Sequence, residues 1–134
     1  MECSNDFDIR IDFLHGWCIP LAHYLFLLCK DKKIKSIFII DVYDKENDEY
    51  AHTLLQINNK YLDVSGIYSY DELQNHMKVE YDLVGIFIKR NKNLSKINIE
   101  EYDNYWKMQY FLNYADFPYI KKVANKIMNE YVIT

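Results

Sequence analysis

One cysteine, one histidine and one aspartate of this chain follow one another in an order that suits nucleophilic catalysis by a thiol. Such catalysis needs a thiolate, a base that forms the thiolate and a group that orients the base. Cys18 stands between Gly16 and Pro20, which together indicate that a helix begins there. The free N–H groups and the dipole of a helix start stabilise negative charge. Cys18, His52 and Asp63 are therefore the candidate catalytic residues.

A predicted hairpin brings His52 and Asp63 together. Residues 50–57 and 61–64 have the composition of strands, and the two asparagines at 58–59 suit a two-residue turn, because asparagine tolerates positive φ. With that turn, Asp63 lies one diagonal step from His52 on the same face of the sheet. A three-residue turn would place the two side chains on opposite faces. In the first register, Asp63 can reach a ring nitrogen of His52 and support its protonated form.

The remaining pattern predicts an α+β fold in a single domain over residues 1–134. The apolar run over residues 21–29 predicts a buried central helix. Ser69 and Glu72 have the spacing of a capping box, which predicts the start of a short helix. About four strands should form an antiparallel sheet on which the first helix packs. In chain order we expect a helix at 17–30, strands at 34–43, 50–57 and 61–64, a helix at 69–77, a strand at 81–89, and helices at 99–114 and 118–131.

The order of these residues and elements resembles the papain-like superfamily in its broad sense, which includes bacterial cell-wall endopeptidases, transglutaminase-like domains and arylamine N-acetyltransferases. Three segments carry the resemblance: Gly16-Trp17-Cys18-Ile19-Pro20-Leu21-Ala22, Ala51-His52-Thr53-Leu54 and Tyr61-Leu62-Asp63-Val64-Ser65-Gly66. The resemblance covers about residues 13–77. It implies a papain-like core over about residues 13–90 and a helical C-terminal extension over about residues 98–131.

The same resemblance implies a role for each candidate: nucleophile for Cys18, general base for His52 and orienting acid for Asp63. The chain departs from the family near the nucleophile, where no glutamine precedes Cys18 as an oxyanion donor. The backbone N–H of Cys18 can supply one such donor. The implied function is a thiol-dependent hydrolase or acyl transferase that acts on a protein or peptide as peptidase, deamidase or transferase, with no cofactor and no metal.

A second function is open, because the C-terminal region is rich in aromatic residues. Tyr102, Tyr105, Trp106 and Tyr110 lie on or beside one helical stripe. Such a stripe either packs on the core or presents tyrosine and tryptophan to a partner. The alternative function is therefore a non-catalytic phage or mobile-element protein that binds and inhibits a host protein through an aromatic surface. The same surface would allow a homo-oligomer.

Other polar residues have simpler interpretations. Asp41, near the end of a predicted strand, is a second candidate for the orienting acid. His15 and His23 have a spacing to Cys18 that zinc ligands can show, but no paired ligand motif supports a metal site. His23 is expected to be a hydrogen-bonded polar residue of the buried helix, and His76 is expected to be solvated.

Composition and charge limit the partners and the compartment. The formal net charge of −4 and the scattered basic residues argue against a nucleic-acid partner. The longest apolar run, residues 19–29, is too short to span a bilayer, so we expect no membrane partner. No secretory signal is recognised, and the three cysteines have the irregular spacing of free thiols, with Cys29 expected in the core. These features together predict a cytoplasmic protein.

Overall fold

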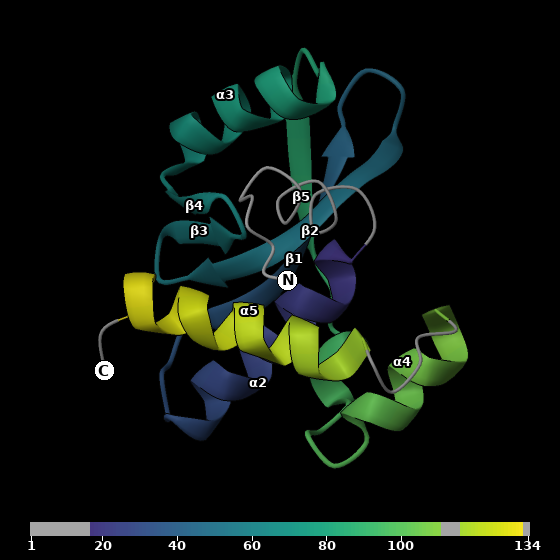
Figure 1. Ribbon diagram of the computed structural model, residues 1–134. Coiled ribbons are helices and arrows are strands. Elements are labelled where there is room, and N and C mark those ends of the chain that lie inside the picture. The colour runs from purple at the N-terminus through teal and green to yellow at the C-terminus, as the bar shows by residue number, and fades with distance from the viewer. Residues whose placement is uncertain (1–16, 111–115, 133–134) are drawn as a thin grey trace.

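The computed structural model describes residues 17–110 and 116–132 and has an α+β fold (Figure 1). The elements are α2 (Cys18–Asp31), β1 (Ile37–Asp44), β2 (Glu49–Ile57), β3 (Lys60–Asp63), β4 (Gly66–Tyr68), α3 (Tyr70–Tyr81), β5 (Ile86–Arg90), the short 3-10 helix η1 (Leu94–Lys96), α4 (Tyr102–Tyr110) and α5 (Asp116–Tyr131). The five strands form one antiparallel sheet in the order β4-β3-β2-β1-β5. The predicted α+β class, with the first helix packed on an antiparallel sheet, is confirmed.

The apolar side chains of the described residues form two clusters, one on each face of the sheet. The larger cluster joins α2, α4 and α5 to Ile39, Leu55 and Leu62. The smaller cluster joins α3 to Ile40 and Leu54. Because successive residues of a strand point to opposite faces, α2 and α3 pack against opposite faces of the sheet, and Figure 1 shows α3 well apart from α2 and α5. The central helix α2 is buried along most of its length, as its apolar sequence predicts.

The hairpin between β2 and β3 has the predicted two-residue turn. Asn58 has a φ of 57°, and Ile57 pairs with Lys60. This left-handed conformation is one that asparagine adopts more readily than most residues. The register therefore carries Asp63 to the position beside His52 that the sequence analysis expected.

Within the described residues the sheet has five strands, where about four were expected, because residues 66–68 form β4. Gly66 begins this strand with a φ of +146°, a conformation that favours glycine. A strand of this length is too short to show an alternating pattern. The last strand begins at Ile86 rather than at residue 81, because α3 continues to Tyr81 and ends at Asp82 in a left-handed conformation.

The start of α3 is fixed by the predicted capping box. The Ser69 hydroxyl accepts a hydrogen bond from the Glu72 backbone N–H at 3.2 Å, and the Glu72 carboxylate accepts one from the Ser69 N–H at 2.8 Å. These two bonds satisfy backbone donors that have no partner inside the helix. They also place the rest of α3, which carries His76 and Tyr81, over the strands that hold the candidate site.

Tyr102 and Trp106 of α4 lie inside the protein rather than on an exposed aromatic surface. Tyr102 is fully buried, and its hydroxyl donates a hydrogen bond to the Pro20 carbonyl at 2.7 Å. Trp106 is also buried, and its Nε1–H donates to Nδ1 of His23 at 2.8 Å. Buried tyrosine and tryptophan usually find such partners, and here they attach α4 to α2. The prediction that these two residues form a partner-binding surface is therefore wrong.

The other two residues of the predicted aromatic surface give it no further support. Tyr105 is half-buried, with its ring 4.8 Å from the Trp106 ring in an edge-to-face arrangement. The side chain of Tyr110 lies outside the described part of the chain. The helix itself begins at Tyr102 rather than at residue 99, and the predicted helical residues 111–114 are also outside the described residues.

Candidate active site

Cys18 is the first residue of α2, as the positions of Gly16 and Pro20 predict. The helix starts after Trp17, whose carbonyl accepts a hydrogen bond from the Leu21 N–H at 3.1 Å. The side chain of Cys18 is nearly buried, with 7 % of its surface exposed. A thiol at this position lies next to free N–H groups and the positive end of the helix dipole, and both favour the thiolate.

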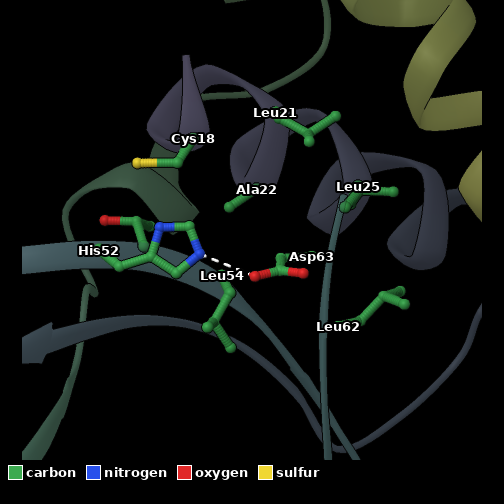
Figure 2. Close-up of a pocket in the computed structure, with 9 residues that line it drawn as sticks. Cys18, Leu21, Ala22, Leu25, His52, Leu54, Leu62 and Asp63 are labelled. Atoms are coloured by element: carbon green, nitrogen blue, oxygen red, sulfur yellow. Dashed lines mark hydrogen bonds and ion pairs between the residues drawn. The ribbon is translucent and has the colours of Figure 1, made fainter. Parts of the chain in front are cut away.

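His52 on β2 and Asp63 on β3 form the predicted pair. His52 Nε2 lies 2.9 Å from Asp63 Oδ2, and both side chains are almost completely buried. Figure 2 shows the Cys18 sulfur on the opposite side of the imidazole ring from Asp63. Because Asp63 occupies Nε2, the other ring nitrogen, Nδ1, is the one that can exchange a proton with Cys18. The structure thus brings all three candidate residues together.

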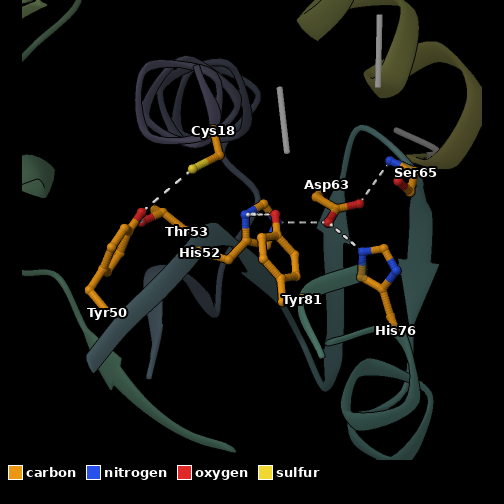
Figure 3. Close-up of polar contacts among 8 residues, drawn as sticks. All are labelled: Cys18, Tyr50, His52, Thr53, Asp63, Ser65, His76 and Tyr81. Carbon is orange, nitrogen blue, oxygen red and sulfur yellow. Dashed lines mark hydrogen bonds and ion pairs between the residues drawn. The ribbon is translucent and has the colours of Figure 1, made fainter. Parts of the chain in front are cut away.

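Asp63 is held by more donors than the sequence analysis expected. Its Oδ1 accepts the backbone N–H of Ser65 at 2.8 Å, and its Oδ2 also lies 3.2 Å from Nε2 of His76 (Figure 3). Burial raises the pKa of Asp63, but the hydrogen bonds and the charges of His52 and His76 outweigh this effect and lower the pKa to well below the ordinary value of 3.8. The carboxylate therefore stays ionised and fixed in place at any pH near neutral.

The expectation that His76 is solvated is wrong. The side chain is buried, binds Asp63 and stacks on Tyr68 with the ring centres 4.6 Å apart. Its position in the helix offered a signal, because His76 follows the buried Leu73 by three residues and adjoins the buried Met77. Residues three and four apart share a helix face, so the apolar stripe of α3 already includes this histidine.

Tyr81, at the end of α3, is a second site residue that sequence reasoning missed. Its hydroxyl lies 3.0 Å from Nδ1 of His52 (Figure 3). The residue was expected to begin a strand, and the longer α3 instead brings it over the imidazole ring, with the ring centres 5.2 Å apart. Tyr81 therefore helps to fix the ring of His52 on the side where the proton exchanges.

Charge interactions favour an ion pair between Cys18 and His52. Burial lowers the pKa of His52, but hydrogen bonding with Asp63 and Cys18 and their negative charges raise it to about 9. Burial raises the pKa of the Cys18 thiol, but hydrogen bonding with His52 and the positive charge of His52 lower it more, to below the ordinary value of 9.0. An imidazolium and a thiolate therefore stabilise each other across this contact.

Cys29 shows the contrasting behaviour of a core thiol on the same helix. It is fully buried, and its sulfur lies 3.7 Å from the sulfur of Met128. Burial raises the pKa of the Cys29 thiol to about 11. The prediction that this cysteine is a core residue is confirmed, and Cys29 can serve as an internal reference for the reactivity of Cys18.

Asp41 does not take the alternative role of orienting His52. Its carboxylate accepts hydrogen bonds from the Thr53 hydroxyl at 2.8 Å and from the Asn91 side-chain amide at 3.1 Å. Asp41 pairs with Thr53 across β1 and β2, whereas His52 pairs with Val42. Neighbouring strand positions point to opposite faces, so the side chains of Asp41 and His52 leave the sheet on opposite faces.

His23, one of the two histidines considered as zinc ligands, is not available to bind a metal ion. His23 Nε2 lies 2.9 Å from the carbonyl oxygen of Ile97, and its Nδ1 accepts the Trp106 N–H, so both ring nitrogens are used within the core. His23 is thus the hydrogen-bonded polar residue that was expected. His15 lies outside the described residues. Within the ranges that the structure describes, no group of three or more His, Cys, Asp or Glu side chains is arranged to hold a metal ion.

The candidate site is narrow and lined mainly by apolar side chains. The space around Cys18, His52 and Asp63 leaves no room for a water molecule, and the apolar residues that line it are Leu21, Ala22, Leu25, Leu54 and Leu62. In this largely apolar setting charge interactions are strong. Tyr50, whose hydroxyl lies 3.5 Å from the sulfur, is 45 % exposed.

No protein-family model, no curated protein and no solved structure matches this chain. The papain-like resemblance therefore stays a prediction that rests on the residues and their geometry. No helix within residues 17–110 and 116–132 is both long and apolar enough to cross a membrane.

Proposed function

We propose that this protein is a thiol-dependent hydrolase or acyl transferase in which Cys18 is the nucleophile, His52 the general base and acid, and Asp63 the residue that orients His52. The observation that carries the proposal is the buried His52–Asp63 pair, 2.9 Å apart, beside a cysteine at a helix start. A paired, buried histidine next to an activated thiol is typical of cysteine-nucleophile enzymes. The order of helix, His strand and Asp strand supports a papain-like core.

The reaction begins with attack of the Cys18 thiolate on a carbonyl carbon of an amide or thioester. The S–C bond forms, and the carbonyl electron pair moves to oxygen, where the backbone N–H of Cys18 can donate a hydrogen bond. The proton on Nδ1 of His52 passes to the leaving amine or thiol as its bond to carbon breaks. A thioester between Cys18 and the acyl group remains.

The second half of the reaction restores the ion pair. Water or an acceptor amine attacks the thioester carbon, and its proton passes to Nδ1 of His52. The sulfur then leaves as a thiolate beside the imidazolium. Throughout both halves, Nε2 of His52 keeps its hydrogen bond to Asp63, so a single nitrogen carries every proton transfer. A protein or peptide substrate fits this chemistry, and a reducing compartment such as the cytoplasm keeps the thiol available.

Acylation by p-nitrophenyl acetate, followed by peptide mass spectrometry, tests this function. We expect an acetyl group on Cys18 within the first turnover, no acetylation of Cys29, and no release of p-nitrophenol above background in Cys18→Ser. In denaturant the two cysteines should react at similar rates, which controls for the reagent. Acetylation of folded Cys18 no faster than that of Cys29 would overturn the proposal.

A further inference from the structure

A second chain of polar side chains reaches the Cys18 sulfur on the side away from His52 (Figure 3). The Tyr50 hydroxyl lies 3.5 Å from the sulfur and 2.6 Å from the Thr53 hydroxyl. The Thr53 hydroxyl donates to Asp41 Oδ1 at 2.8 Å. The proposed catalytic cycle uses none of these three residues, although one of them touches the nucleophile.

A β-bulge explains why Tyr50 and Thr53 meet. Residues three apart in a regular strand point to opposite faces. The pairing of β1 with β2 shifts between Val42, opposite His52, and Tyr43, opposite Tyr50, so one residue of β2 is extra. The bulge turns Tyr50 to the face of Thr53, and bulges commonly re-aim side chains beside active sites.

While Asp41 is ionised, the hydrogen bonds that link Asp41, Thr53 and Tyr50 can run in one direction only, because a carboxylate accepts hydrogen bonds and does not donate them. The single proton of the Thr53 hydroxyl goes to Asp41, so the Thr53 oxygen accepts the proton of Tyr50. Tyr50 then turns a lone pair toward Cys18, and it accepts a hydrogen bond from the S–H group in the state in which Cys18 is protonated and its S–H group points away from His52. When Cys18 loses its proton in this arrangement, the chain loses one hydrogen bond.

We propose that Asp41 is a positioning residue that sets the direction of this chain and thereby restrains ionisation of Cys18. The inference rests on the proposed function, because it concerns the same nucleophile. His52 and Asp63 promote the thiolate from one side, and Asp41 opposes it through Thr53 and Tyr50 from the other. The thiol is then ionised chiefly when His52 can hold its proton, which limits unwanted reactions of the sulfur.

Asp41→Asn should reverse the direction of the hydrogen bonds through Thr53 and Tyr50. The Asn91 amide donates to Asp41 Oδ2, and Asn91 cannot turn around without cost, because its own side-chain oxygen accepts the Leu94 N–H at 3.1 Å. In Asp41→Asn the new carbonyl oxygen must therefore face Asn91, and the new NH₂ group must face Thr53. Thr53 then donates to Tyr50, and Tyr50 donates to the sulfur, which stabilises the thiolate.

The pH dependence of Cys18 alkylation by iodoacetamide, followed by peptide mass spectrometry, tests this inference. The midpoint of the profile reports ionisation of the thiol. Limited access of iodoacetamide to the sulfur lowers the rate equally at every pH and therefore does not move the midpoint. We expect Asp41→Asn to increase the thiolate fraction below the midpoint by about tenfold, the effect of about one hydrogen bond to a charged group. Circular dichroism would establish that each variant is folded.

Combining Asp41→Asn with a second substitution distinguishes an effect through the hydrogen bonds of Thr53 and Tyr50 from the simple loss of a negative charge. In Tyr50→Phe and in Thr53→Val the chain is broken, so Asp41→Asn should produce little further shift, whereas Thr53→Ser keeps the hydroxyl and should preserve the shift. Asp44→Asn is the matched control on the same strand, because the Asp44 carboxylate binds Glu46 N–H and Asn47 instead. An unchanged midpoint in Asp41→Asn, or a shift that survives in Tyr50→Phe, would overturn the inference.

His52→Ala in the same series keeps this result distinct from a failure of the proposed function. If His52→Ala moves the midpoint and Asp41→Asn does not, the directional chain is wrong and the catalytic proposal stands. If Asp41→Asn produces the expected, Tyr50-dependent shift and His52→Ala has no effect, the chain is supported and the role of His52 is contradicted.

Discussion

Asp63→Ala is expected to lower the free energy of unfolding by about 3–5 kcal/mol at pH 6, the usual cost of removing one partner from a buried ion pair. The substitution leaves the protonated His52 without its counter-charge in a fully buried position. It also removes the acceptor for His76 and for the Ser65 N–H. Urea unfolding followed by circular dichroism measures the change.

The pH dependence of this loss follows from the two pKa shifts. The pKa of Asp63 is held below its ordinary value of 3.8, so its contribution to stability is complete above that pH and is lost as the pH falls through the native value. The pKa of His52 is raised from 6.5 to about 9, so its contribution is complete below pH 6.5 and is lost as the pH rises through 9. The difference in the free energy of unfolding between wild type and Asp63→Ala should therefore be largest between pH 3.8 and pH 6.5, where both contributions are complete.

Two controls make the stability result specific. Glu46→Ala removes a carboxylate from an exposed turn and should change the free energy of unfolding by less than about 0.5 kcal/mol. Asp63→Asn keeps the shape of the side chain and should fall between wild type and Asp63→Ala. A loss in Asp63→Ala no larger than that in Glu46→Ala would show that the buried pair does not stabilise the fold.

His52→Ala is expected to reduce the rate of Cys18 acetylation by p-nitrophenyl acetate at neutral pH by about 10²–10⁴-fold, the range for loss of a positioned base. The physical reason is that Cys18 loses both the hydrogen bond and the positive charge that lower its pKa, while the burial that raises its pKa remains. Stopped-flow release of p-nitrophenol gives the rate.

His76→Ala is the matched control for that experiment. It removes a second histidine from the same carboxylate and leaves the His52–Asp63 pair in place. We expect a much smaller loss of rate than in His52→Ala, because His76 contacts Asp63 and not the reacting sulfur. Equal losses in the two variants would indicate that both act by disturbing the fold.

The sequence predicted the local features of the site well, because each depends on a few neighbouring residues. Pro20 fixed the start of α2, and the asparagine turn fixed the register that joins His52 to Asp63. The capping box of α3 was equally local. These are features in which backbone geometry follows directly from residue type.

The parts that were missed depend on packing between distant segments. The sequence contains no signal for the bulge in β2, so the contact of Tyr50 with Cys18 could not be foreseen. Tyr81 reaches His52 because α3 continues to the point where a strand was expected. The sequence of the aromatic stripe that includes Tyr102 was compatible with both burial and partner binding. The hydrogen bonds from α4 to α2 show that Tyr102 and Trp106 are buried.

The central claim is that Cys18 and His52 form an ion pair, and the thiolate absorbance of Cys18 as a function of pH tests it most directly. The difference between wild type and Cys18→Ser isolates this thiol from Cys29 and from the tyrosines, and it needs no reagent to enter the narrow site. We predict half-ionisation of Cys18 at a pH clearly below 9.0, the ordinary value for a cysteine. Half-ionisation at or above pH 9.0 would contradict the ion pair between Cys18 and His52. Cys29, whose pKa burial raises to about 11, shows the value expected of a buried thiol without such a partner.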